Sequence, residues 1–268
     1  MVTSKKAIVS KNVEMSTKLP VGYIFSERDL EIADIELWMD TRIYRIFPIS
    51  RFIQVLTTQT LTLVKPKKWD DPFENALLSA TFVVDGESTS FAAKESVYGQ
   101  CWTLHRETDA MWRIYSHGKD GVRVTTTPRK LLTALKRHVG KQADVKCFIG
   151  KVQYAKKSNL KGIFEKIDLM KTDGSGIAES LLYKRQEFAH EKEMRLIYNG
   201  DDTKCESDIF SFKIDANELF DRVLFDPRMD ESLQDAYMDT LESLGCDVEV
   251  RRSTLYDPPE NMQIKIPG

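Results

Sequence analysis

The stretch EFAHEKEMRLIY carries two carboxylates two residues apart, Glu191 and Glu193, followed by Arg195. If this stretch forms a strand, successive side chains alternate between its faces, so these three residues share one face and Met194 and Leu196 share the other. Two like charges on one face repel each other unless a cation compensates them. The pattern therefore has two interpretations: a carboxylate row that lines a cleft, or a solvent-facing strand with ordinary ion pairs.

A second acidic segment, KPKKWDDPFENALL, places Asp70, Asp71 and Glu74 around a proline turn next to Trp69. An aspartate at this place caps the helical turn that follows, and Glu74 favours the first turn of that helix. The alternative is a divalent metal held by these acids, although their spacing specifies no coordination shell. The four histidines and four cysteines also lack the spacing of a zinc site, so the sequence predicts no zinc.

The composition is that of an ordinary soluble protein. Of the 268 residues, 41% are hydrophobic and 30% are charged, and the formal net charge is −2. This balance argues against a general nucleic-acid coat or a polybasic membrane anchor. The scattered cysteines suit a reducing compartment, and no apolar run has the roughly 18 residues of a membrane span. We therefore expect a cytoplasmic protein with no membrane partner.

The elements that must position these groups mix strands and helices without the regular alternation of a parallel, doubly wound fold. We expect one α+β domain over residues 19–268, with a mixed, mainly antiparallel sheet and flanking helices, after a loose arm at residues 1–18. Strands are expected in residues 42–49, 61–66, 98–105, 120–127, 145–155, 190–198, 210–215, 222–227 and 247–253. Helices are expected in residues 26–40, 50–59, 107–118, 128–139, 178–188 and 233–244.

The helix expected in residues 128–139 is basic on one side. Leu131, Leu132 and Leu135 fall on one face, which is typical of an amphipathic helix that packs on a core. The alternative is a contact with nucleic-acid phosphates through the cations Arg129, Lys130, Lys136, Arg137 and Lys141.

Several short motifs together carry a resemblance. The order IYRIF, KWDDPFEN, MWRIYS followed by GVRV, EKEMRLIY and STLY, over residues 43–256, resembles an uncharacterised bacterial family of domains of unknown function, DUF2971. The order of elements also resembles the ADP-ribosyltransferase fold of the R-S-E type. In that pattern the arginine is Arg45, the serine or threonine is Thr103, and the E-x-E strand holds Glu191 and Glu193.

The resemblance implies roles for these residues around NAD. Cleavage of the bond between nicotinamide and ribose builds positive charge on the sugar, which Glu193 would stabilise. Glu191 would orient or deprotonate the acceptor, and Arg45 would anchor the dinucleotide through its planar fork of donors. Thr103 would hydrogen-bond behind Glu193 and fix its rotamer. An aromatic ring from Tyr44, Trp112 or Tyr115 would stack on nicotinamide.

The first hypothesis is thus an NAD-dependent transferase that moves ADP-ribose onto a macromolecular acceptor, either a protein or a nucleic acid. The resemblance implies a bacterial toxin or phage-defence setting and a partner or antitoxin protein. A second hypothesis is a metal-dependent nuclease or phosphodiesterase built from the acids Asp70, Asp71 and Glu74, the E-K-E acids and Lys192. A third is a non-catalytic sensing or partner-binding module in which Glu191, Glu193 and Arg195 form an ion-pair network.

Overall fold

The structure is a computed structural model that describes residues 22–24, 35–200, 207–260 and 262–264. The expected arm at residues 1–18 and the first part of the helix expected in residues 26–40 lie outside the described residues. The rest of that helix is α2 (Ile35–Met39). The division of the chain into an arm and one domain stays a prediction.

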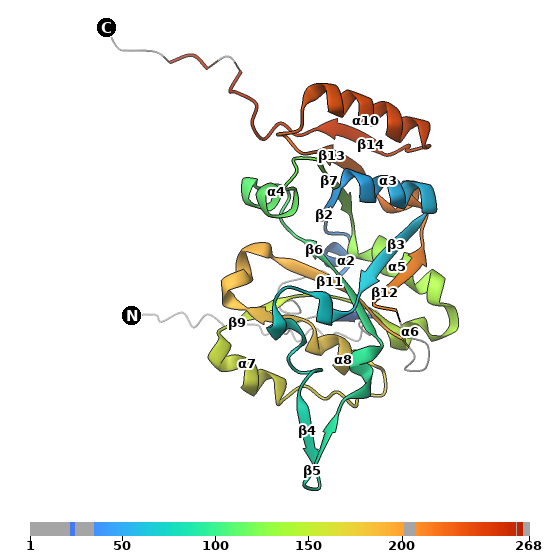
Figure 1. Cartoon of the computed structure of the whole chain (residues 1–268), viewed down its shortest axis with the longest axis vertical. Helices are drawn as coiled ribbons and strands as arrows, with labels where there is room; N and C mark the ends of the chain where they lie inside the picture. Colours follow the sequence, from blue (N-terminus) through green and yellow to red (C-terminus); the bar gives the residue numbers. More distant parts are fainter. Residues whose placement is uncertain (1–21, 25–34, 201–206, 261, 265–268) are drawn as a thin grey trace, which may run out of the picture.

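A ten-stranded mixed sheet forms the centre of the molecule (Figure 1). Its main path runs through β1 (Tyr23–Ile24), β8 (Cys147–Lys151), β11 (Glu193–Asn199), β6 (Val97–Thr103), β2 (Ile43–Pro48), β7 (Gly121–Thr126), β13 (Arg222–Phe225) and β14 (Glu249–Arg252). Off this path, β3 (Thr60–Val64) pairs with β6 and with β12 (Ile209–Lys213). Only the pairs β1–β8 and β13–β14 of this sheet are parallel, so the expected α+β class with a mainly antiparallel sheet is confirmed.

The strand β6 lies at the point where this sheet divides. On one side it pairs with β11 along its length, so that Glu193 lies opposite Thr103 and Arg195 opposite Cys101. On its other side β6 meets two strands: β3 near Gly99 and β2 at Thr103. The backbone between these two points has no strand partner on that side, and an opening in the sheet results.

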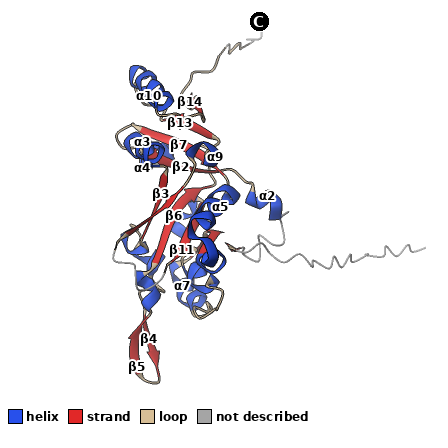
Figure 2. Cartoon of the chain, turned by 90° about the vertical axis from the view of Figure 1, so that its right-hand side faces the viewer, coloured by secondary structure: helices blue, strands red, loops and turns tan. Residues whose placement is uncertain are grey.

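Helices and short strands cover both faces of this sheet. The amphipathic helix α5 (Pro128–Val139) lies beside the sheet in Figure 2 and contacts β8 and β12. Its buried leucines share a core with Met194 and Leu196 of β11. A second core, which includes Ile197, lies on the opposite face of β11. The remaining helices are α3 (Ile49–Thr58), α4 (Asp109–Tyr115), α6 (Ala143–Lys146), α7 (Lys157–Phe164), α8 (Ser175–Ser180), α9 (Ala216–Leu219) and α10 (Glu231–Ser243).

The prediction of a helix in residues 178–188 is wrong beyond Ser180. Helix α8 ends at Ser180, and the chain then extends as β10 (Tyr183–Arg185), which pairs in parallel with β9 (Gln153–Ala155). A 3₁₀ turn at Gln186–Glu191 follows. The apolar spacing of residues 181–188 suits a helix, but pairing with β9 overrides it. The extended conformation carries Lys184 into the interior.

A hairpin and a helix lie towards the two ends of the molecule. The hairpin of β4 (Thr81–Val84) and β5 (Glu87–Ser90) projects at one end, and α10 lies at the other (Figures 1 and 2). No helix in the described part of the chain has the length and apolar composition needed to cross a membrane.

Gly99 of β6 makes room for an aromatic ring that the site requires. A Cβ at this position would lie 2.6 Å from Cζ2 of Trp69, so Gly99→Ala should displace the ring and lower the free energy of unfolding by about 1–3 kcal/mol. Urea denaturation measures this loss. The control is Gly162→Ala in α7, where no atom lies within 4 Å of the added Cβ and a small gain of about 0.5–1 kcal/mol is expected. Equal stability of the two variants would contradict the close packing of Trp69.

Candidate functional site

A buried ammonium group joins the acidic residues that the sequence places apart. Nζ of Lys184 lies 3.0 Å from Oε1 of Glu74 and 2.9 Å from Oε1 of Glu193, and it also donates to Oε2 of Glu191. The three acids come from the turn Pro72–Asn75, the start of β11 and the turn Gln186–Glu191. All four side chains are at most 10% exposed, so water screens these charges weakly.

Arg195 is the second cation of this cluster and is fully buried. Its Nε donates to Oε2 of Glu193 at 2.8 Å, its Nη2 to Glu74, and its Nη1 to the backbone oxygen of Leu181 at 2.6 Å. The guanidinium also lies 4.5 Å from the centre of the Trp69 ring. We call Glu74, Lys184, Glu191, Glu193 and Arg195 the acidic cluster. It contains three carboxyl groups and two cations.

The expected placement of Glu191 on the strand is wrong. β11 begins at Glu193, and Lys192 has a left-handed backbone conformation with φ of 43°. Its carbonyl accepts a hydrogen bond from the amide of Leu104. The turn removes Glu191 from the alternation of the strand, yet Lys184 still brings the two carboxylates together. The solvent-facing interpretation is also wrong, because Glu193 is 5% exposed and Arg195 0%.

Thr103 supports this turn in a way that differs from the expectation. Its hydroxyl donates to the backbone oxygen of Glu191 at 2.6 Å and accepts from the amide of His105 at 3.0 Å. Thr103 therefore fixes the backbone that carries Glu191, and it does not hydrogen-bond the carboxylate of Glu193. The carboxylate of Glu193 is instead oriented by Lys184 and Arg195.

The shared environment separates the pKa values of the two carboxyl groups. Burial, together with the neighbouring Glu193, raises the pKa of Glu191 to about 7. Burial also acts to raise the pKa of Glu193, but Arg195, Glu191 and Lys184 outweigh it and lower that pKa to about 2. Two carboxyls in contact titrate as a pair in separated steps. Near neutral pH, one proton can therefore be taken up or released at Glu191.

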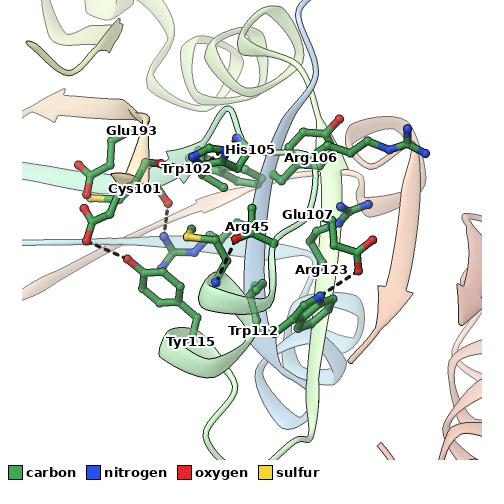
Figure 3. Close-up of a pocket in the computed structure, with 16 residues that line it drawn as sticks. Arg45, Cys101, Trp102, His105, Arg106, Glu107, Trp112, Tyr115, Arg123 and Glu193 are labelled. Atoms are coloured by element: carbon green, nitrogen blue, oxygen red, sulfur yellow. Dashed lines mark hydrogen bonds between the residues drawn. The ribbon is translucent and has the colours of Figure 1, made fainter. Parts of the chain in front are cut away.

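One cavity is lined by all seven residues that the sequence assigns to the site (Figure 3). Its volume is about 90 Å³, and it adjoins a larger cavity of about 480 Å³ that shares Arg45, Tyr115, Glu191 and Glu193 in its walls. The hydroxyl of Tyr115 donates to Oε1 of Glu191 at 3.3 Å, and Tyr115 as a residue is 41% exposed. The roles assigned to these residues stay predictions. The seven are Tyr44, Arg45, Thr103, Trp112, Tyr115, Glu191 and Glu193.

Arg45 lies at the opening in the sheet. Its Nη1 donates to the backbone oxygen of Cys101, in the part of β6 between the contacts with β3 and β2. Its buried Nε has no hydrogen-bond partner in the described part of the chain, and burial lowers the pKa of the group. The guanidinium therefore closes one gap in the sheet and keeps a donor for another partner.

The other aromatic residues differ in how much surface they leave free. Trp112 is fully buried, and its indole N–H donates to Glu107 at 2.8 Å. The ring of Tyr44 is covered by the guanidinium of Arg123, 4.7 Å from the ring centre. Tyr115 is thus the best placed of the three to stack on a ligand.

Two cations of this site could not be assigned to it from the motifs in the sequence. Lys184 falls in a segment with helical spacing, and nothing in that pattern indicates a buried lysine. Arg123 is 4% exposed in the strand GVRVTT and lines the cavity. A lone charge inside a β-branched run is unusual, and this signal was sufficient to find it.

Four of the acids proposed for metal binding, Asp71, Glu74, Glu191 and Glu193, already have cationic or backbone partners. Asp71 accepts from the amide of Phe73 at 3.1 Å, as expected for a cap, and pairs with Arg185 at 3.0 Å. Glu74 belongs to the acidic cluster. Within the described ranges, no group of three or more histidine, cysteine, aspartate or glutamate residues could hold a metal ion.

The basic helix α5 packs as the amphipathic interpretation expects. Leu131, Leu132 and Leu135 are at most 1% exposed. Four of its cations pair with carboxylates: Arg129 with Asp40, Lys130 with Asp221, Lys136 with Asp144 and Arg137 with Glu218.

Comparison with known proteins gives one family. Residues 111–196 match the family described as "Protein of unknown function (DUF2971)", so the resemblance to this family is confirmed over that segment. The segment contains Trp112, Tyr115, Arg123, Glu191 and Glu193 but not Arg45. No curated protein matches the sequence.

Among solved structures, the chain is similar to Thermus sp. 2.9 DarT. The complex with ADP-ribosylated ssDNA shares 10% identity at a TM-score of 0.37, over 80% of this chain and 94% of that one. The complex with NAD+ shares 9% identity at a TM-score of 0.37, over 80% and 96% of the two chains. A likeness this distant assigns no activity.

Lys184 should be more important for stability than any surface lysine. Lys184→Met leaves three carboxyl groups buried around an apolar side chain, and we expect a loss of about 3–5 kcal/mol in the free energy of unfolding. Chemical denaturation measures it. Lys130→Met removes a pair with Asp221 in which both side chains are more than one third exposed, and it should cost less than about 1 kcal/mol. Similar small losses in both variants would show that the acidic cluster is not the main constraint.

The pKa of Glu191 predicts a pH dependence of stability. Because this pKa is raised from 4.5 to about 7, the folded protein binds the proton more tightly than the unfolded chain, and ionisation across this window lowers stability. Glu193, with its pKa lowered to about 2, loses its contribution only below pH 4.5.

The variant Glu191→Gln cannot ionise. Relative to wild type, its free energy of unfolding should therefore rise between pH 4.5 and 8, by up to about 3 kcal/mol. Urea denaturation at several pH values tests this, with exposed Glu187→Gln as the control that follows wild type. A wild-type-minus-variant difference that is constant with pH would mean that Glu191 is ionised throughout.

Proposed function

We propose that this protein is an NAD-dependent transferase that moves ADP-ribose onto a macromolecular acceptor. One observation carries the proposal: the guanidinium of Arg45 and the carboxyl pair of Glu191 and Glu193 line one cavity, although they come from opposite ends of the sequence. The acceptor, protein or nucleic acid, and the toxin or phage-defence setting, the partner or antitoxin protein and the cytoplasmic location stay predictions.

The walls of the cavity suit both the phosphate and the nicotinamide parts of a dinucleotide. Arg45 offers a donor without a partner to the pyrophosphate or a ribose. The exposed ring of Tyr115, whose hydroxyl contacts Glu191, offers a surface for nicotinamide. The larger adjoining cavity provides room beyond the small one. In this arrangement the bond between nicotinamide and ribose lies close to the carboxyl pair.

The charges of the acidic cluster suit the chemistry of that bond. When nicotinamide leaves, the ribose gains positive oxocarbenium character, which buried negative charge stabilises. When Glu191 is ionised, the three carboxylates exceed the two cations by one negative charge. Glu193 supplies a carboxylate that stays ionised, since its pKa is lowered to about 2.

Glu191 is the group suited to proton transfer. Its raised pKa of about 7 makes it half ionised near neutral pH, which is where a general base works best. In the proposed reaction Glu191 accepts the proton of the acceptor nucleophile as that nucleophile attacks the ribose. The proton then stays on a carboxyl that Lys184 and Tyr115 hold in place.

A second candidate function rests on the ion pairs within the acidic cluster. Each of its three carboxyl groups already contacts at least one buried cation, and this pairing suits a non-catalytic binding module with a rigid ionic core. In that case NAD would not be consumed, and substitutions in the cluster would change stability without changing any turnover.

The test is release of nicotinamide from NAD, together with binding of NAD measured by NMR. Glu191→Gln should slow release or transfer by about 100- to 10,000-fold while the affinity for NAD changes little. Arg45→Lys should instead weaken binding, because a lysine lacks the planar fork. The matched controls are Glu187→Gln, on the same turn as Glu191, and Arg51→Lys, on the exposed face of α3. If folded wild-type protein neither binds NAD at millimolar concentration nor releases nicotinamide, the transferase proposal is wrong.

A further inference from the structure

Arg123 is a buried cation with no carboxylate within ion-pair distance among the described residues. It lies in the middle of β7, opposite Ile46 of β2 and Leu224 of β13, and is 4% exposed. Its guanidinium rests on the ring of Tyr44, and neither Nε nor Nη1 has a hydrogen-bond partner in the described part of the chain. Figure 3 shows it next to Glu107, at the end of the cavity opposite Glu193.

Glu107 attracts this guanidinium through its charge but does not contact it. Its Oε1 accepts from the indole N–H of Trp112 and from the hydroxyl of Ser253, and it forms no ion pair with Arg123 within 4.0 Å. Arginine keeps its charge at any pH a protein experiences. A buried charge with unpaired donors is costly for the fold, so an anionic ligand that supplies the missing acceptors explains its position.

A small cavity beyond Arg123 is rich in cations. It adjoins the first cavity, with which it shares Tyr44, Arg106 and Arg123, and its volume is about 50 Å³, enough for a group larger than one water. Two further lining residues are already paired: Arg222 with Glu249 at 2.6 Å and Asp221 with Lys130 at 2.5 Å. Three guanidiniums therefore remain without a carboxylate partner among the described residues, those of Arg42, Arg106 and Arg123.

We propose that the cavity between Arg42, Arg106 and Arg123 is a phosphate-binding subsite. Guanidinium forks match the oxygens of a phosphate and give short, charge-assisted hydrogen bonds. Arg123 forms the fixed base of the subsite, since its side chain is held against Tyr44. Arg42 and Arg106 are exposed and close over the ligand from the rim. The subsite does not depend on NAD being consumed.

The phosphate can come from two sources with the same chemistry. One is the pyrophosphate or a terminal phosphate of a dinucleotide that extends from the first cavity. The other is a phosphodiester of a nucleic-acid acceptor that enters from the outer end. The shared walls of the two cavities place either phosphate next to the carboxyl pair, so the source is decided by experiment.

The first experiment measures the melting temperature of the full chain with inorganic phosphate and with pyrophosphate. Wild-type protein should gain at least about 3 °C at saturation. Arg123→Met should melt at or above the wild-type temperature without ligand, because it removes an unpaired buried charge, and should gain nothing from either anion. Arg252→Met, which breaks a surface pairing with Glu231 and Asp235, should gain as much as wild type. If Arg123→Met does not fold, exposed Arg106→Gln provides the same comparison and should at least halve the gain.

The second experiment identifies the source by titrating NAD and a short single-stranded oligonucleotide into each variant. A tenfold or greater loss of NAD affinity in Arg123→Met, with oligonucleotide binding unchanged, assigns the subsite to the dinucleotide. If Arg123→Met instead loses oligonucleotide affinity and keeps NAD affinity, the subsite belongs to a nucleic acid. In that case the slope of log affinity against log salt concentration should also fall in magnitude by about one in the variant. Both patterns support a phosphate subsite. The proposal is overturned if wild type and Arg123→Met respond equally to all four ligands, or if wild type responds to none.

Discussion

The ion pairs of Lys184 with three buried carboxyl groups are the constraint on which this site depends. Like charges this close are stable only around a cation, and a buried cation is stable only among acceptors. The local structure follows from that requirement. Helix α8 ends at Ser180, and Lys184 lies in the extended strand that follows, with its side chain in the interior. The proline turn at residues 72–75 places Glu74 next to it. The ring of Trp69 then lies between Gly99 and Arg195 and fills the space beside the second cation.

The division of the sheet explains why a cavity opens beside this cluster. A continuous ladder on both sides of β6 would leave no gap next to Cys101, but β2 and β3 meet β6 at different points. The carbonyl left at the gap is satisfied by Arg45. The same opening that needs a side-chain donor thus exposes Tyr115, Glu191 and Glu193 to a ligand. The guanidinium of Arg45 therefore has a structural role, and in the proposed function it also binds the ligand.

The strands could be read from the sequence more reliably than the turns between them. Alternating side chains located β2 and β11, because a strand in a sheet places successive residues on opposite faces. The strands β6 and β7 are buried on both faces and were located as short strand-forming segments next to turns. Residues 181–188 were misread as a helix, because their apolar spacing is helical and only the pairing of β10 with β9 overrides it. The position of Glu191 could not be derived either. It depends on the left-handed turn at Lys192, which hydrogen bonds from the amide of Leu104 and the hydroxyl of Thr103 stabilise. The convergence of Arg45 with the carboxyl pair was anticipated from a family resemblance, not from any local pattern.

The distribution of charge along the cavity favours a ligand over a purely structural network. A rigid ionic core needs balanced charges within one cluster, and Lys184 and Arg195 come close to providing that balance. It does not need the buried Nε of Arg45 or the buried Nε and Nη1 of Arg123, which have no hydrogen-bond partner among the described residues. Both guanidiniums line the same cavity as Glu191 and Glu193 of the acidic cluster, which has one more carboxyl group than it has cations. Separating uncompensated charges of opposite sign across a space destabilises the folded protein, unless a molecule with an anionic part and a part that becomes cationic bridges them. A dinucleotide that loses nicotinamide has both parts, with the phosphates at the arginines and the developing charge at the carboxylates.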